Sequence, residues 1–389
     1  MVSARKPSEA SQHKVLAVGL KLLHLVGLWG EDRRKWYRVV VFCLSFIIIP
    51  PKMFLGSGKD TYDSYVRNVA ELIFTCENDA WMVIFTYRQD SFRKLVEILE
   101  CFFNRDWPDE LRNQIETLNR WMYMVAKFYV IYVGVLVVLF VNVPIVATVA
   151  GLIFNTKAEM DEFFLITETQ FYGLDIRRDL LSWAIFTSFS TIVSCSGGFV
   201  MMLKGVIAQI IIHYGAKLFE LVSKRIKLME QIVDSDQRDC EFRKIIELHN
   251  LSLEYLRYLE HTLSFSLLNI TLSCLMMWCL MLFYISKNFN GVSGVCFLIP
   301  FVALLGEMTV YSINGTNLQK QASAVADAIC EYPWYREPVA MQKAVGFMIQ
   351  RAQQPAGITA GKFHYIDLQR LGAMLQATYS YYLILKDRF

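Results

Sequence analysis

The chain of 389 residues is 54% hydrophobic and 14% aromatic, and it carries a formal net charge of only +3; its mean hydropathy is +0.33. Soluble domains are about 45–50% apolar and disordered chains are less apolar still, so this composition argues against both classes. The nearly balanced charge gives no reason to expect a nucleic acid partner. Residues 1–14 are polar and lack the pattern of a signal peptide. We therefore expect the first membrane segment to act as an uncleaved insertion signal.

The first predicted element is a short amphipathic helix at residues 15–30, which we expect on the inner membrane surface. Beyond it lie apolar runs that reach or exceed the roughly 20 residues a helix needs to cross the hydrocarbon core. Seven runs predict transmembrane helices, at residues 37–56, 66–87, 121–154, 181–213, 263–286, 292–313 and 366–386. The predicted fold class is therefore all-α, a polytopic membrane protein. The seventh run is the least apolar, since it contains Gln369, Arg370, Gln376, Thr378 and Ser380.

Lysine and arginine predict the orientation, because these residues accumulate in cytoplasmic segments. Four alternate connecting stretches hold 26 of them: 1–36, 88–120, 214–262 and 314–365. The other four hold 6: 57–65, 155–180, 287–291 and 387–389. We therefore expect a cytoplasmic N-terminus and, after seven crossings, an external C-terminus. This orientation is opposite to that of G-protein-coupled receptors.

Two predicted cytoplasmic regions have helical patterns of their own. The stretch 214–262 is charged, lacks proline and repeats apolar residues at helical spacing, which predicts long helices extending beyond the membrane. Residues 339–350 predict a second amphipathic helix, which Pro355 and Gly357 end. The predicted organisation begins with a cytoplasmic N-terminus and an interfacial helix at residues 1–36. Transmembrane helices one to six follow at 37–313, with a ligand pocket and the cytoplasmic extensions at 214–262. Cytoplasmic anchor helices are predicted at 314–365, and the pore-lining last helix with an external C-terminus at 366–389.

Motifs of catalysis are missing from the sequence. It contains no GxGxxG, P-loop, GxSxG or HExxH motif, and its six histidines form no i, i+4 pair. We therefore predict no enzyme, no cofactor and no metal site. None of the nine cysteines falls in a predicted external segment, which favours free thiols over disulfides.

Polar and charged residues interrupt the apolar runs. The second run holds Arg67, Glu71, Glu77, Asn78 and Asp79. Since a charge in the membrane costs about 2.5–3.5 kcal/mol on insertion scales, we expect them to face the bundle interior, a cavity or one another. Arg67 and Glu71 are spaced to pair. Both a polar cavity lining and simple helix packing fit this pattern, and packing is the simpler interpretation.

Two further charges lie in later runs and allow the same two interpretations. Glu307 lies near the inner end of the sixth run. Lys204 lies in the fourth run, and in the simplest interpretation its long side chain extends toward the cytoplasmic headgroups.

The C-terminal fifth carries an ordered set of short motifs. They are Glu331-Tyr-Pro333-Trp334-Tyr335, then Ile349-Gln-Arg351-Ala-Gln353-Gln-Pro355, then Ala360-Gly361-Lys362, and finally Ala377-Thr378-Tyr379-Ser380-Tyr381-Tyr382-Leu383. This order, at the end of an inverted seven-helix chain, resembles the insect odorant receptor family. The related gustatory receptors end in T-Y, five hydrophobic residues and Q-F, and that Q-F is absent here. The family's co-receptor has an enlarged cytoplasmic loop that this chain lacks, so the chain resembles an odour-tuning subunit.

The resemblance implies a ligand-gated, non-selective cation channel that assembles as a hetero-tetramer with the co-receptor. It further implies binding of a small volatile, mostly apolar or aromatic, in the outer half of the plasma membrane of olfactory neuron dendrites. A gustatory-type receptor channel and a G-protein-coupled receptor remain as alternatives, and the absent Q-F and the inverted topology argue against them.

Three sets of site residues follow from helix spacing combined with the resemblance. The odorant-binding set lies at outer-half depth: Ile73, Phe74, Ala147, Ala150, Gly151, Phe154, Phe186, Phe189, Ser190, Val193, Val295, Leu298 and Phe301. The pore set shares one face of the last helix: Leu371, Leu375, Thr378, Tyr382 and Lys386. The anchor set is expected between subunits: Ile245, Leu248, Trp334, Tyr335 and Met348. The resemblance implies apolar gate residues where this chain has Tyr382 and Lys386, and a lysine is unfavourable in the ring of a cation pore. Lys386 therefore either points to the outer headgroups or lies at the pore mouth while partner subunits supply apolar residues there. The second placement fits a hetero-tetramer and is the one we favour.

Overall fold

The computed structural model describes residues 17–25, 29, 43–45, 47–55, 62–154, 162–289 and 291–388. The predicted N-terminal tail and the start of the first predicted span lie outside these residues. The described helices and strands are α2 (Ala17–Leu25), the π-helical turn η1 (Pro51–Leu55), α4 (Tyr62–Tyr87), α5 (Gln89–Phe103), α6 (Asp109–Phe154), α7 (Leu180–Leu228), η2 (Met229–Gln231), α8 (Ser235–Asn288), α9 (Val292–Glu331), η3 (Trp334–Arg336), α10 (Val339–Ala352), β1 (Thr359–Ala360), β2 (His364–Tyr365) and α11 (Leu368–Arg388).

Four described helices combine spanning length with a sufficiently apolar composition: α6, α7 with η2, α8 and α9. Helices α4 and α11 are long enough but more polar. In the long helices the predicted span and the predicted extension form one continuous helix, and α7 and α9 continue through Gly215 and Gly315 at that junction. The fold class predicted from the sequence, a polytopic all-α membrane protein, is confirmed.

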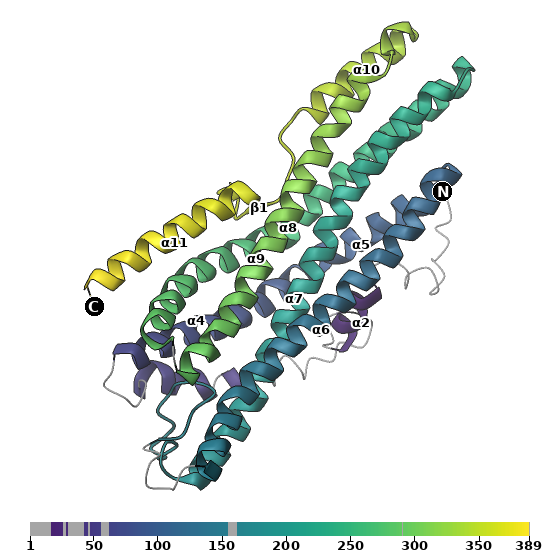
Figure 1. Ribbon diagram of the computed structural model, residues 1–389. Helices are drawn as coiled ribbons and strands as arrows, with labels where there is room; N and C mark the ends of the chain where they lie inside the picture. Colours follow the sequence, from purple (N-terminus) through teal and green to yellow (C-terminus); the bar gives the residue numbers. More distant parts are fainter. Residues whose placement is uncertain are drawn as a thin grey trace.

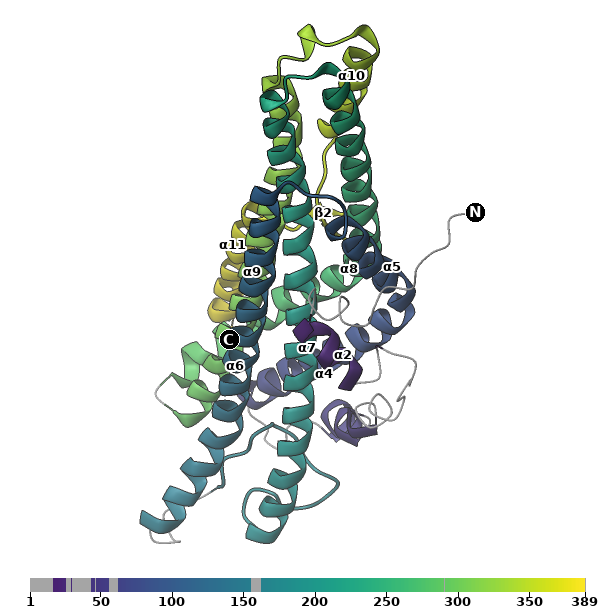
Figure 2. The same ribbon diagram turned by 90° about the vertical axis from the view of Figure 1, so that its right-hand side faces the viewer.

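Helix α7 is the central helix of the bundle. Every residue from Val200 to Ile212 is buried, and the helix packs against α9, α6 and α8. A helix that is apolar on all sides is typical of such a fully surrounded position. Figures 1 and 2 show the ends of α7, α8 and α9 rising together with α10 at one end of the molecule, which we call the α10 end. At the opposite end α6 stops and α7 begins, joined by a segment of which 162–179 is described.

Hydrogen bonds and ion pairs at the α10 end tie the start of α8 to the turn after α9. Arg238 pairs with Glu337 at 2.9 Å, and the Tyr332 hydroxyl donates to the same carboxylate at 2.7 Å. Burial and this hydrogen bond raise the pKa of Tyr332, so the phenol stays protonated as a donor. The Glu-Tyr-Pro-Trp-Tyr motif therefore forms a structural turn.

The Ala-Gly step of the sequence forms a tight hairpin that leads into α11. Strands β1 and β2 pair antiparallel, and Gly361 between them has φ +58°, a conformation that favours glycine. The Gly361 amide donates to the Ser264 carbonyl of α8 at 2.9 Å. On α9, Gly315 lets the Ile366 carbonyl approach so closely that a Cβ would overlap it. These two contacts fix where α11 begins against α8 and α9.

Candidate ligand-binding site

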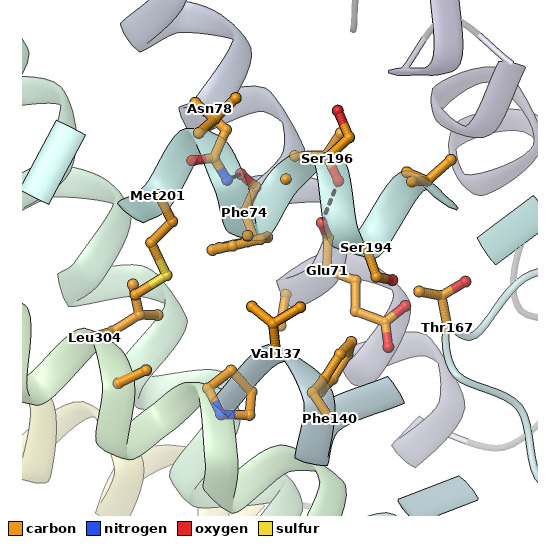
Figure 3. Close-up of a pocket in the computed structure, with 18 of the residues that line it drawn as sticks. Glu71, Phe74, Asn78, Val137, Phe140, Thr167, Ser194, Ser196, Met201 and Leu304 are labelled. Atoms are coloured by element: carbon orange, nitrogen blue, oxygen red, sulfur yellow. Dashed lines mark hydrogen bonds between the residues drawn. The ribbon is translucent and has the colours of Figure 1, made fainter. Parts of the chain in front are cut away.

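A cavity of about 130 Å³ lies inside the bundle, between the 43–55 segment and helices α4, α6, α7 and α9. Figure 3 shows Phe74, Val137, Phe140, Met201 and Leu304 around it, so much of its wall is apolar and aromatic. A mostly apolar cavity with a few polar groups is typical of a small-molecule site.

Helix spacing and small residues explain how these elements form the cavity. On α4 the lining residues recur at i, i+4, as in Ala70, Phe74 and Asn78. On α7 the small residues Ser194, Ser196, Gly197 and Gly198 line it. A Cβ on Gly198 would overlap Val137 of α6, so that glycine permits the close packing of α6 and α7 beside the cavity.

A buried ionic network joins the cavity wall to the segment between α6 and α7. Glu71 accepts from Lys52 at 2.6 Å, from Arg67 at 2.9 Å and from the Glu168 amide at 2.8 Å. Arg67 also donates to the Leu165 and Ile166 carbonyls. The Arg67–Glu71 pair predicted from the sequence is confirmed. Thr167, next to Glu168, lines the cavity (Figure 3), so this network holds the segment over the cavity.

A second buried ionic cluster lies beyond the other end of the cavity. Lys204 is 1% exposed, pairs with Glu77 at 2.6 Å and lies 3.9 Å from Glu307. The Tyr311 hydroxyl donates to Glu307 at 2.6 Å. The prediction that Lys204 extends to the headgroups is wrong, because two carboxylates from α4 and α9 offer it partners inside the bundle. The sequence signal for this cluster was the presence of Glu77, Lys204 and Glu307 in three separate apolar runs.

The structure brings only part of the predicted odorant-binding set to this cavity. Phe74 and Val193 line it. Ile73 is half-buried and packs against the main core. The α6 members lie beyond the cavity, and Phe154 at the helix end is 84% exposed; the remaining α6 members are Ala147, Ala150 and Gly151.

Other members of that set lie elsewhere on α7 and α9. Phe186 and Phe189 contact Phe171, with ring centroids 5.1 and 5.7 Å apart, in a small cluster at the α6–α7 end, and Ser190 is buried near them. On α9, Val295 and Leu298 are exposed, and Phe301 packs against the main core. The cavity instead contacts the neighbouring face of α9, at Phe297, Ile299, Pro300, Ala303 and Leu304.

The predicted pore set is divided between two environments on α11. Leu371 and Thr378 are 7% and 1% exposed, and Tyr382 packs against the core of the same subunit. Leu375 and Lys386 are exposed. One face of α11 therefore contacts α8 and α9, while the other remains open.

The predicted anchor set shows the same division. Ile245, Leu248 and Met348 are 0%, 2% and 5% exposed and pack inside the subunit. Trp334 is half-buried and Tyr335 is 62% exposed. Among residues that the prediction missed, Phe347 on α10 is 74% exposed.

Together, the described fold and site define a polytopic helical membrane protein with a mostly apolar cavity within its bundle. Comparison with known proteins identifies the family. The model of the 7tm odorant receptor family matches residues 62–379, and the chain belongs to this family.

Relatives and solved structures agree with that assignment. Odorant receptor 13a of Drosophila melanogaster is 24% identical over 98% of this chain and 96% of its own length. Odorant receptor 49a of the same species is 26% identical over 52% of this chain and 50% of its own length. The structure of the insect olfactory receptor OR5 from Machilis hrabei in complex with eugenol matches with a TM-score of 0.78 at 13% identity, over 96% of this chain and 98% of that one.

Proposed function

We propose that this protein is the odour-tuning subunit of a ligand-gated, non-selective cation channel, which it forms as a hetero-tetramer with the family's co-receptor. The observation that carries the proposal is the mostly apolar cavity at the meeting point of α4, α6, α7 and α9. The solved relative of the same fold is a complex with eugenol, a small odorant, which supports a ligand of similar size here.

We assign odorant binding to the residues that line this cavity, with Phe74 and Val193 retained from the predicted set. Aromatic faces such as Phe74, Phe140 and Phe297 offer stacking surface to a small apolar ligand. Thr167, in the segment between α6 and α7, lines one end of the cavity. Odorant binding between helices α4, α6, α7 and α9 is then coupled to the pore through α9, which packs against α11.

We assign the pore to the open face of α11. That face carries mostly small and polar residues, all exposed, which are Gln369, Gly372, Gln376, Ser380 and Asp387, together with the exposed Leu383. They recur at spacings of three, four or seven, so they share one side of the helix. A polar face suits a water-filled path for cations better than the face that contacts α8 and α9. Lys386 lies to one side of this stripe, where its stem reaches the outer headgroups.

The helices at the α10 end form the proposed cytoplasmic anchor. The exposed aromatic side chains Tyr335 and Phe347 of that end are suited to contacts between subunits, since clustered exposed apolar groups mark interfaces. In this proposal the N-terminus lies in the cytoplasm and the C-terminus outside the plasma membrane of the sensory dendrite, as the distribution of lysine and arginine predicts. An N-terminal epitope should then stain only permeabilised cells, and staining of intact cells would reverse the orientation.

Co-expression with the co-receptor tests the proposal directly. Cells that express both chains should give odorant-evoked cation currents that persist when G-protein signalling is blocked. The co-receptor alone, tested with the same panel of volatiles, is the control. Currents that vanish under the block would support G-protein coupling in place of a channel.

A further inference from the structure

One wall of the cavity presents hydrogen-bond acceptors without matching donors. Asn78 is 4% exposed, and its amide nitrogen donates to the Phe74 carbonyl at 3.0 Å (Figure 3). That bond fixes the amide orientation and leaves the Asn78 Oδ1 atom without a hydrogen-bond partner among the described residues. A buried carbonyl oxygen without a hydrogen-bond partner is unfavourable, so a ligand donor that pairs with it stabilises the occupied cavity.

The neighbouring Asp79 differs from the other acidic side chains buried in this part of the bundle. Glu71, Glu77, Glu168 and Glu307 each lie within 4 Å of a lysine or arginine. Within the described residues, Asp79 has no such cation, and its hydrogen bond comes from the Ser45 hydroxyl at 3.1 Å. Asp79 lines the cavity and has acceptor capacity beyond that one bond.

Several donors near this wall are already engaged. The Thr75 hydroxyl donates to the Glu71 carbonyl at 2.9 Å, and the Ser45 hydroxyl donates to Asp79. The Lys52 ammonium donates to Glu71, Asn68 and the Glu168 carbonyl. The Ser194, Ser196 and Thr167 hydroxyls also line the cavity, but within the described residues none of them donates to Asn78 Oδ1, so a ligand O–H or N–H can supply that bond.

From this juxtaposition we infer that the cavity selects odorants that donate a hydrogen bond to Asn78 and Asp79 from an otherwise apolar body. Alcohols, phenols and amines supply such a donor, whereas ethers, esters and ketones only accept. A site built to pair with a ligand O–H or N–H discriminates against the analogue that lacks it, because its own polar groups stay unpaired. This inference rests on the proposed function and names the ligand class of the same site.

Matched odorant pairs in cells that express the chain with its co-receptor test the inference. Suitable pairs are 4-methylphenol with 4-methylanisole, and 1-octanol with heptyl methyl ether. In the wild type, the odorant that donates a hydrogen bond should evoke a half-maximal current at a concentration at least about tenfold lower than its acceptor-only partner. Asn78→Leu should bring that ratio toward one. Asp79→Asn, which keeps the shape but adds amide donors, should shift it toward the acceptor-only odorant.

Thr86→Val is the matched control, since Thr86 lies on the same helix but outside the cavity lining, and its hydroxyl donates to the Met82 carbonyl at 2.8 Å; the ratio should stay at the wild-type value. A comparison of octylamine with 1-octanol separates the two donor chemistries. If octylamine is more potent and Asp79→Asn removes that advantage, the preferred donor is an ammonium group. If octylamine has no advantage, the preferred donor is a neutral hydroxyl group. If Asn78→Leu fails surface labelling, Asp79→Asn carries the test.

Equal potencies within each pair in the wild type, or a donor preference that both variants leave unchanged, would overturn the inference. Failure of the proposed function looks different, because no volatile would then evoke current although both chains label at the cell surface.

Discussion

Replacing Lys204 by methionine is expected to unfold much of the protein or keep it from the cell surface. Methionine preserves most of the side-chain volume but removes the ammonium that lies between Glu77 at 2.6 Å and Glu307 at 3.9 Å. All three side chains are about 1% exposed, so two carboxylates would remain buried without a cation. Breaking such a pair costs about 3–5 kcal/mol, a large part of the roughly 5–15 kcal/mol that stabilises a typical folded protein.

Thermal unfolding of the detergent-solubilised protein, followed by size-exclusion chromatography, measures this loss together with surface labelling. The triple variant Glu77→Gln, Lys204→Met, Glu307→Gln removes every charge at similar volume and should regain most of the lost stability. Lys127→Met is the control, because this lysine of α6 is exposed. A Lys204→Met protein with the wild-type midpoint would refute the argument that the ammonium neutralises a buried cluster.

Three further outcomes follow from the described contacts. Gly315→Ala should lower the thermal midpoint by the equivalent of about 1–3 kcal/mol, because its Cβ meets the Ile366 carbonyl; an unchanged midpoint would show that α11 can shift freely. Phe347→Asp should leave the fold intact but abolish co-purification with the co-receptor, and normal co-purification would remove this residue from the interface. Gln376→Lys should change the reversal potential under asymmetric cation concentrations, whereas Thr378→Val should not; the opposite result would assign the pore to the other face of α11.

The helices could be predicted from the sequence because apolar runs and breakers are local signals. The runs 121–154, 181–213, 263–286 and 292–313 all lie inside α6, α7, α8 and α9. The ends of the helices were harder to predict from the sequence. Helix α7 continues from its apolar run through the charged residues up to Leu228, since a hydropathy criterion stops at charges while the backbone hydrogen bonding continues.

The candidate cavity was harder to locate, because its position depends on how far each helix is shifted along its neighbours. The sequence favoured outer-half depth on α6 and α7, around Ala150 and Phe189. The cavity lies farther from the α6–α7 junction along both helices, at Phe140 and at residues between Val193 and Met201, where Gly198 permits the close approach of α6. Close packing at a glycine depends on the partner helix, so periodicity within one helix does not reveal it.

Sequence spacing likewise did not reveal which face of α11 packs against its own subunit, whereas the tertiary contacts do. Spacing correctly groups Leu371 with Thr378, but every amphipathic helix in an assembly has two partners, its own subunit and the others. Which face meets which partner is decided by tertiary contacts, and here Gly315 and Gly361 fix the start of α11 so that Thr378 turns toward its own subunit. Gln376 is thereby directed away from α8 and α9 and remains exposed. A polar side chain on an exposed face of a membrane helix is unfavourable against lipid and favourable against water, so this face has a physical reason to meet a pore rather than the hydrocarbon.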